Sequence, residues 1–125
     1  MRRSESWLAA LAAGWALAAG AASAQTAEMA RGAEVYDDRC SSCHVLDGSV
    51  GQGPSLRGVM GRKAGTVSGF AYTPALKASG VTWTPATLDR WLTGPQKLVP
   101  GTAMTAVVPD ARERSDLLAY LAALR

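Results

Sequence analysis

The apolar positions of this chain follow a helical spacing near both ends and lose it in the middle. Residues 28–43 predict a helix, because small and apolar residues recur three and four positions apart along one face. These residues are Met29, Gly32, Tyr36 and Cys40. Residues 110–124 predict a second helix, whose apolar stripe consists of Leu117, Tyr120, Leu121 and Leu124. Such stripes usually belong to a core, so we expect the two terminal helices to pack on each other.

Gly32 has two interpretations within the first predicted helix. It either lets another helix approach closely or is merely a weak point of its own helix.

The middle of the chain predicts shorter helical pieces. Thr84-Pro85 is typical of a helix start and Gly94-Pro95 of a helix end, with an inner face of Leu88, Trp91 and Leu92 between them. A single helical turn is expected over residues 74–78.

Residues 48–69 contain seven glycines in 22 positions. Neither a helix nor a strand persists at that density, so a long loop is expected. Its apolar residues Pro54, Leu56, Val59 and Met60 favour an ordered loop over a disordered one.

Residues 1–24 differ in composition from everything that follows. Arg2 and Arg3 precede an almost uninterrupted run of Ala, Leu, Trp and Gly over residues 7–22, and Ala22-Ser23-Ala24 has the small-x-small pattern of a signal peptidase site. The run has 16 residues, fewer than the ~20 that a helix needs to cross a membrane, which favours cleavage over retention as an anchor. We therefore expect a signal peptide over residues 1–24, cleavage after Ala24, and one periplasmic domain over residues 25–125.

Composition excludes several classes of protein. The chain has 125 residues, which is roughly one folding unit and too little for a large enzyme. Loss of residues 1–24 removes two arginines and one glutamate and lowers the formal charge from +3 to +2. No run of Lys and Arg with interleaved aromatics suggests nucleic-acid binding. One histidine and two cysteines do not make a structural zinc site of the finger kind.

Both cysteines and the only histidine fall into one motif, Cys40-Ser41-Ser42-Cys43-His44. Two thiols at i and i+3 lie on one side of a helical turn, where they can add to the two vinyl groups of a haem. The adjacent imidazole then reaches the iron from the same side. The alternatives are a simple disulfide and a thioredoxin-like redox pair. The latter requires a strand before the motif, and no run of β-branched residues precedes Cys40.

A second axial ligand has to come from methionine, because the chain has no second histidine. Met29 lies too near Cys40 in sequence to reach the far face of the ring. Met104 follows the turn-forming Pro100-Gly101-Thr102-Ala103 and lies 60 residues past His44. Met104 is thus the preferred candidate. Met60 is the fallback and an open or water-bound position is the further alternative, since a loop methionine more often fills a gap in the core.

The chain after residue 24 resembles class I cytochromes c, specifically the mitochondrial cytochrome c and bacterial cytochrome c2 group. The motifs that carry the resemblance occur in the family's order: Gly61-Arg62-Lys63-Ala64-Gly65, Gly69-Phe70-Ala71-Tyr72-Thr73, Gly80-Val81-Thr82-Trp83, Pro100-Gly101-Thr102-Ala103-Met104 and Asp116-Leu117-Leu118-Ala119-Tyr120-Leu121. The resemblance implies the all-α class I cytochrome c fold. In this fold, packed N- and C-terminal helices, shorter helices and long loops surround a covalent haem c.

The resemblance also implies roles for individual residues. Cys40 and Cys43 would attach one haem c, with His44 and Met104 as the axial ligands of the iron. Pro54 would offer its carbonyl to the free nitrogen of the His44 ring. Donors to the buried propionates would be Arg62, Tyr72 and Trp83. The contact between the terminal helices would be made by Gly32, Tyr36, Leu117 and Tyr120.

The chain departs from the family on the methionine side of the haem. Trp91 stands where relatives often have a tyrosine whose hydroxyl reaches the methionine sulfur, so that hydrogen bond is either missing or comes from the indole N–H. Leu76 replaces a polar residue on the same side of the haem, so the pocket there is less hydrated. Relatives usually have a ring of surface lysines and an aromatic residue around the exposed haem edge. This chain has fewer of the lysines and lacks the aromatic residue, because the positions are occupied by Gln96, Ala103, Ala106 and Asp110. We therefore expect partner docking to depend less on salt than in lysine-rich relatives.

These expectations together describe a periplasmic electron carrier that cycles between Fe(II) and Fe(III). It would be a monomer without catalytic residues, would exchange electrons with redox proteins, and would meet the membrane only transiently through their complexes. One alternative is a haem enzyme or gas-binding sensor with a labile sixth ligand. Another is a cytochrome subunit of a larger oxidoreductase complex, retained at the membrane by residues 7–22.

Overall fold

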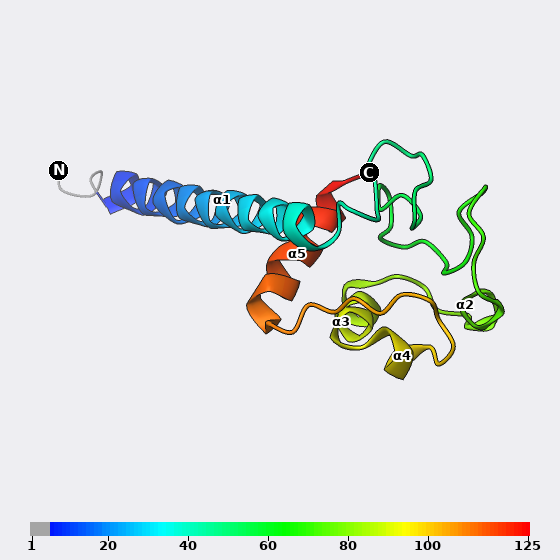
Figure 1. Ribbon diagram of the computed structural model, residues 1–125. Coiled ribbons are helices and arrows are strands. Elements are labelled where there is room, and N and C mark those ends of the chain that lie inside the picture. The colour runs from blue at the N-terminus through cyan, green and yellow to red at the C-terminus, as the bar shows by residue number, and fades with distance from the viewer. Residues whose placement is uncertain (1–5) are drawn as a thin grey trace.

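The computed structural model describes residues 6–125, with side chains from Leu17 onward (Figure 1). The helices in this range are α1 (Ser6–Arg39), α2 (Pro74–Ala78), α3 (Pro85–Thr93), α4 (Pro95–Leu98) and α5 (Ala111–Ala123). Over residues 6–125 no strand forms, and the isolated β-bridge found there joins Lys63 to Thr82. The all-α class expected from the sequence is confirmed. None of the helices in this range combines the length and apolar character needed to span a membrane.

Helix α1 is longer than the sequence predicted at its N-terminal side and shorter at its C-terminal side. It begins at Ser6 rather than at residue 28, and Figure 1 shows its first half extending away from the rest of the molecule. It ends at Arg39 rather than at residue 43. The Ser41 hydroxyl donates to the Asp37 carbonyl at 2.6 Å, while the Ser41 N–H turns to the carbonyl of Tyr36 at 3.0 Å. A side-chain donor thus replaces the backbone donor of the next helical bond, and the helix ends there.

Helix α5 crosses the C-terminal part of α1 in very close contact (Figure 1). A Cβ added to Gly32 would lie 2.1 Å from the Asp116 carbonyl oxygen and 2.6 Å from Cβ of Tyr120. Gly32 is therefore required by the approach of the two helices and is not a weak point of α1. Beside it, the rings of Tyr36 and Tyr120 lie 5.9 Å apart, and Leu117 is fully buried.

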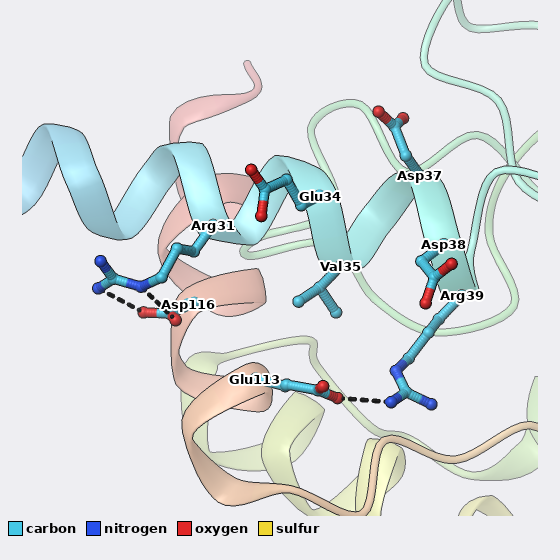
Figure 2. A pocket seen from close by; sticks show the side chains of 8 residues that line it. All are labelled: Arg31, Glu34, Val35, Asp37, Asp38, Arg39, Glu113 and Asp116. Carbon is cyan, nitrogen blue, oxygen red and sulfur yellow. Dashed lines mark hydrogen bonds and ion pairs between the residues drawn. The ribbon is translucent and has the colours of Figure 1, made fainter.

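Two ion pairs join the outer edges of this helix crossing (Figure 2). Arg31 binds the nearly buried Asp116 through two hydrogen bonds, Nε to Oδ2 at 2.9 Å and Nη2 to Oδ1 at 3.2 Å. This carboxylate raises the pKa of the Arg31 guanidinium. Arg39 and Glu113 form the second pair at 2.8 Å, with both side chains about one-third exposed, at 37% each.

The short helices begin at capping residues that can be recognised in the sequence. The Thr84 hydroxyl oxygen accepts a hydrogen bond from the Thr87 N–H, and the Thr87 hydroxyl oxygen accepts one from the Thr84 N–H, while Pro85 occupies the first helical position. Asp110 caps α5 by accepting from the Glu113 N–H at 2.8 Å. Helix α4 was not predicted: Gly94 ends α3 in an extended conformation, and Pro95 then starts another helical turn.

Residues 48–69 form an ordered loop, as predicted. Part of it pairs with the segment before α3: Gly61 N–H donates to the Trp83 carbonyl at 2.7 Å, and Trp83 N–H to the Arg62 carbonyl at 2.9 Å. Gly58 N–H reaches the Leu124 carbonyl at 2.8 Å, and Val59 is buried in the core. The loop is thus fixed to the end of α5 and to the start of α3, on two sides of the core.

Candidate functional site

A cavity of about 430 Å³ lies between the end of α1, helices α3 and α5, and the loops. This volume falls within the ~300–1,000 Å³ usual for small-molecule and cofactor sites. All eight residues that the sequence singled out line it: Cys40, Cys43, His44, Pro54, Arg62, Tyr72, Trp83 and Met104. Much of the remaining wall is apolar and comes from Leu56, Val59, Leu76, Leu88, Trp91, Leu92, Leu117 and Leu121. The cavity therefore brings thiols, an imidazole and a thioether together within hydrophobic walls.

The two cysteines lie on a single turn that follows α1. Cys43 N–H and His44 N–H both donate to the Cys40 carbonyl, at 3.1 and 2.9 Å. No disulfide joins Cys40 to Cys43; Cys40 is buried and Cys43 is exposed. Burial raises the pKa of the Cys40 thiol to about 11. A thioredoxin-like pair needs a thiol whose pKa is lowered and a preceding strand, whereas Cys40 has the opposite shift and follows a helix.

The ring of His44 is held on two sides. Its Nδ1 lies 2.8 Å from the Pro54 carbonyl oxygen, so a proton on Nδ1 leaves the lone pair of Nε2 free to bind a metal. The turn that bears it is fixed by the Tyr36 hydroxyl, which donates to the His44 carbonyl at 2.6 Å. Gly53 lies against the ring, where an added Cβ would be 2.4 Å from Cε1. Gly53 was not predicted as a site residue, although the Gly53-Pro54 pair within the glycine-rich loop was a usable signal.

Met104 contributes its sulfur to the same cavity. The Trp91 indole Nε1 lies 3.2 Å from the Met104 Sδ. Of the two possibilities left open by the sequence, the indole N–H is thus the donor. The Trp91 ring packs edge-on against Trp83, with ring centroids 5.1 Å apart. Met60 is half-buried against the core and Met29 is half-buried on α1, and neither lines the cavity.

The polar part of the wall includes Arg62 and Tyr72. Arg62 donates to the carbonyls of Ser55 and Arg57 at 2.9 and 2.5 Å. Partial burial lowers the pKa of its guanidinium. The guanidinium has both a charge and N–H donors, so an anionic group beside it would be stabilised by charge as well as by hydrogen bonding. The Tyr72 hydroxyl accepts from the Val67 N–H at 3.2 Å and keeps its own proton available to donate.

A second hollow, of about 610 Å³, lies outside the crossing of α1 and α5 (Figure 2). Its walls are charged, and its two arginines, Arg31 and Arg39, are already paired with Asp116 and Glu113. It contains none of the eight predicted site residues. The thiols, imidazole and thioether are instead all in the smaller cavity.

The residues of the smaller cavity fit a covalently attached haem. Haem c is attached by two cysteines in a C-x-x-C-H motif, and its iron accepts histidine and methionine ligands. The half-buried guanidinium of Arg62 and hydroxyl of Tyr72 suit carboxylates, and the leucines suit the apolar ring.

The comparisons with known proteins agree with this site. The family model described as "Cytochrome c" matches residues 29–125. "Cytochrome c 2.1" of Caenorhabditis elegans is 48% identical over 93 residues, which cover 73% of this chain and 84% of that protein. "Cytochrome c-type cyt cy" of Rhodobacter capsulatus is 42% identical over 97 residues, which cover 77% of this chain and 49% of that protein.

A solved structure gives the same result for the fold. Cytochrome cH from Methylobacterium extorquens is similar with a TM-score of 0.70 and 42% sequence identity, over 74% of this chain and 95% of that chain. The class I cytochrome c fold expected from the sequence is thereby confirmed. The chain belongs to the cytochrome c family of electron-transfer proteins and carries haem c through Cys40 and Cys43.

Proposed function

We propose that this cytochrome is a periplasmic electron carrier whose iron is bound by His44 and Met104. The observation that carries the proposal is that one cavity contains both side chains and that each has a polar contact fixing it. The Pro54 carbonyl lies 2.8 Å from the His44 Nδ1, and the Trp91 Nε1 lies 3.2 Å from the Met104 Sδ.

The chain's own residues set the chemistry of such a site. When bound, the haem supplies the Fe(III)/Fe(II) couple. The Pro54 carbonyl orients the His44 ring and increases its basicity, while the Met104 thioether and the apolar walls favour the reduced state and thus a high potential. Two protein ligands leave no position for a substrate, so we expect no bond-making catalysis.

The side chains of Arg62, Tyr72 and Trp83 would hold the haem propionates. The half-buried guanidinium of Arg62 on the cavity wall and the Tyr72 hydroxyl, whose proton is available to donate, support this assignment. Trp83 is 8% exposed, so its indole N–H would donate from a site that excludes most water.

An absorption spectrum of the purified protein in both redox states tests the ligation. A weak band near ~695 nm in the oxidised form is the expected signature of the bond between methionine and iron. Met104→Ala should abolish the band, and the control Met60→Ala should keep it. If Met104→Ala keeps the band, or if the reduced wild-type protein binds carbon monoxide readily at neutral pH, the sixth ligand is not a firmly bound Met104.

The location of the protein depends on residues 1–24. The family match begins at residue 29, and residues 17–27 of α1 are exposed; both observations support a signal peptide that is not part of the folded domain. Arg2 and Arg3 lie outside the described residues. Intact mass measurement of the protein from a periplasmic extract should give a monomer that starts at Gln25. A membrane-bound chain that retains residues 7–22 would favour a fixed subunit of a larger complex.

A further inference from the structure

The side chain of Gln96, at the start of α4, contacts the backbone of the loop that carries Met104. Its Oε1 accepts from the Gly101 N–H at 3.1 Å, and its Nε2 donates to the Thr102 carbonyl. Only one orientation of the amide satisfies both contacts, because the flipped side chain would set N–H against N–H and oxygen against oxygen. Gln96 therefore connects two successive residues of this loop to α4.

The loop needs such a contact. Gly101 has a φ of +91°, and the turn here is closed by one backbone hydrogen bond, from the Thr102 N–H to the Val99 carbonyl at 3.2 Å. Within residues 6–125, the Gly101 N–H and the Thr102 carbonyl have no backbone partner. Thr102 is 6% exposed, so an unpaired carbonyl there would be costly. The Gln96 amide satisfies both groups.

Gln96 and Trp91 act on the same loop from neighbouring helices. The two helices meet at Gly94, whose carbonyl accepts from the Lys97 and Leu98 N–H groups at 3.0 and 3.2 Å. Trp91 on α3 holds the Met104 sulfur, while Gln96 on α4 holds the backbone two and three residues before it. The backbone of the Met104 loop and the Met104 thioether are thus both held by side chains close to the junction of α3 and α4.

We propose that Gln96 is a positioning residue that keeps Met104 facing the cavity and so limits access of small exogenous ligands to the iron. This proposal rests on the proposed ligation by Met104. The probe for it is imidazole, a neutral nitrogen ligand that competes with a thioether for Fe(III).

Two variants of Gln96 separate its two contacts. Gln96→Leu removes both, and Gln96→Lys keeps a donor for the Thr102 carbonyl but cannot accept from the Gly101 N–H. In the oxidised holoprotein we expect the Kd for imidazole to fall about tenfold in Gln96→Leu, equivalent to ~1.4 kcal/mol, and to fall less in Gln96→Lys. The matched control is Lys97→Ala, at an exposed neighbour on α4 for which the described residues show no side-chain hydrogen bond to the loop.

The outcome for Met104→Ala distinguishes a failure of this inference from a failure of the proposed ligation. If Met104→Ala leaves imidazole binding and the ~695 nm band unchanged, the ligation itself is wrong. If Met104→Ala changes both while Gln96→Leu behaves like Lys97→Ala, the ligation stands and the role of Gln96 is overturned. A fall in global stability with unchanged imidazole affinity likewise overturns it, because a merely structural contact would give that result.

Amide hydrogen exchange in the wild-type holoprotein tests the contact without any variant. The Gly101 N–H should exchange much more slowly than the Ala103 N–H in the same loop, because only the former is bound by Gln96. Equal exchange rates at the two amides would overturn the proposal even if Gln96→Leu failed to fold.

Discussion

Gly53 stands where a side chain would collide with the ring of His44, the proposed iron ligand. An added Cβ would lie 2.4 to 2.9 Å from three atoms of the His44 ring. Gly53→Ala should therefore displace the ring from the Pro54 carbonyl and lower the free energy of unfolding of the holoprotein by about 1–3 kcal/mol, the usual cost of overpacking. Guanidinium unfolding measures this. The control Val50→Ala, at an exposed loop position, should stay within ~0.5 kcal/mol of wild type; equal effects of the two changes would contradict the assigned contact.

Asp47 provides a pH-dependent contact in the loop after His44. The Ser49 hydroxyl and N–H both donate to its carboxylate, at 2.6 and 2.8 Å, and lower its pKa below the ordinary 3.8. A lowered pKa in the folded state means that Asp47 adds stability above pH 3.8 and that this contribution is lost as the pH falls through the lowered value. In Ser49→Ala the hydroxyl is gone, so an NMR titration should find the Asp47 pKa closer to 3.8. An unchanged pKa would show that the hydroxyl is not the main cause.

At the scale of the helices, the contact between α1 and α5 has one ion pair with a buried carboxylate and an exposed guanidinium, and a second pair whose two side chains are both about one-third exposed. The Asp116 side chain is 7% exposed, whereas Glu113 is 37% exposed. Asp116→Asn leaves the Arg31 guanidinium without its carboxylate, and we expect a loss of about 1–3 kcal/mol in the free energy of unfolding. Glu113→Gln, the matched change at the exposed pair, should cost less than ~1 kcal/mol. Chemical denaturation of both variant holoproteins measures the two losses in the free energy of unfolding. A larger loss in Glu113→Gln than in Asp116→Asn would contradict the prediction.

The elements that could be predicted from sequence are those with local signals. The stripe over residues 117–124, the Thr84-Pro85 start and the glycine density of residues 48–69 were enough for α5, α3 and the loop. The end of α1 at Arg39 was missed, because it depends on the Ser41 hydroxyl competing for a backbone carbonyl. Helix α4 was missed because Gly94-Pro95 was interpreted only as a helix end.

The candidate site residues could be chosen from the sequence because the chemistry they suggest uses residue types that are rare in this chain. One histidine and two cysteines leave little choice, and all eight candidates line one cavity. The sequence did not indicate the contacts that form only when separate segments come together in the fold. Gly53, which contacts the His44 ring, and Gln96, whose side chain contacts the 100–104 loop, look like ordinary loop and surface residues until the chain is folded.

At the scale of the whole molecule, the opening of the haem cavity has little charge. Ala103, Thr105 and Ala106 line the cavity and are exposed, and none of them is ionisable. Arg39 lines the cavity as well, but its guanidinium is paired with Glu113. A redox partner that docks at this opening therefore meets small neutral side chains, and long-range attraction contributes little to the encounter.

This surface predicts a shallow salt dependence of electron transfer with an acidic redox partner. Stopped-flow measurement of the association rate should show a fall of less than about tenfold between ~10 mM and ~150 mM salt, because screening acts only on charges that are present. Ala103→Lys adds one charge at the cavity opening and should raise the rate at low salt and steepen its fall. Ala78→Lys, at an exposed position on α2 outside the cavity lining, is the control for added net charge and should change the slope less. A fall of several orders of magnitude in the wild-type protein would show that charges elsewhere on the surface steer the encounter.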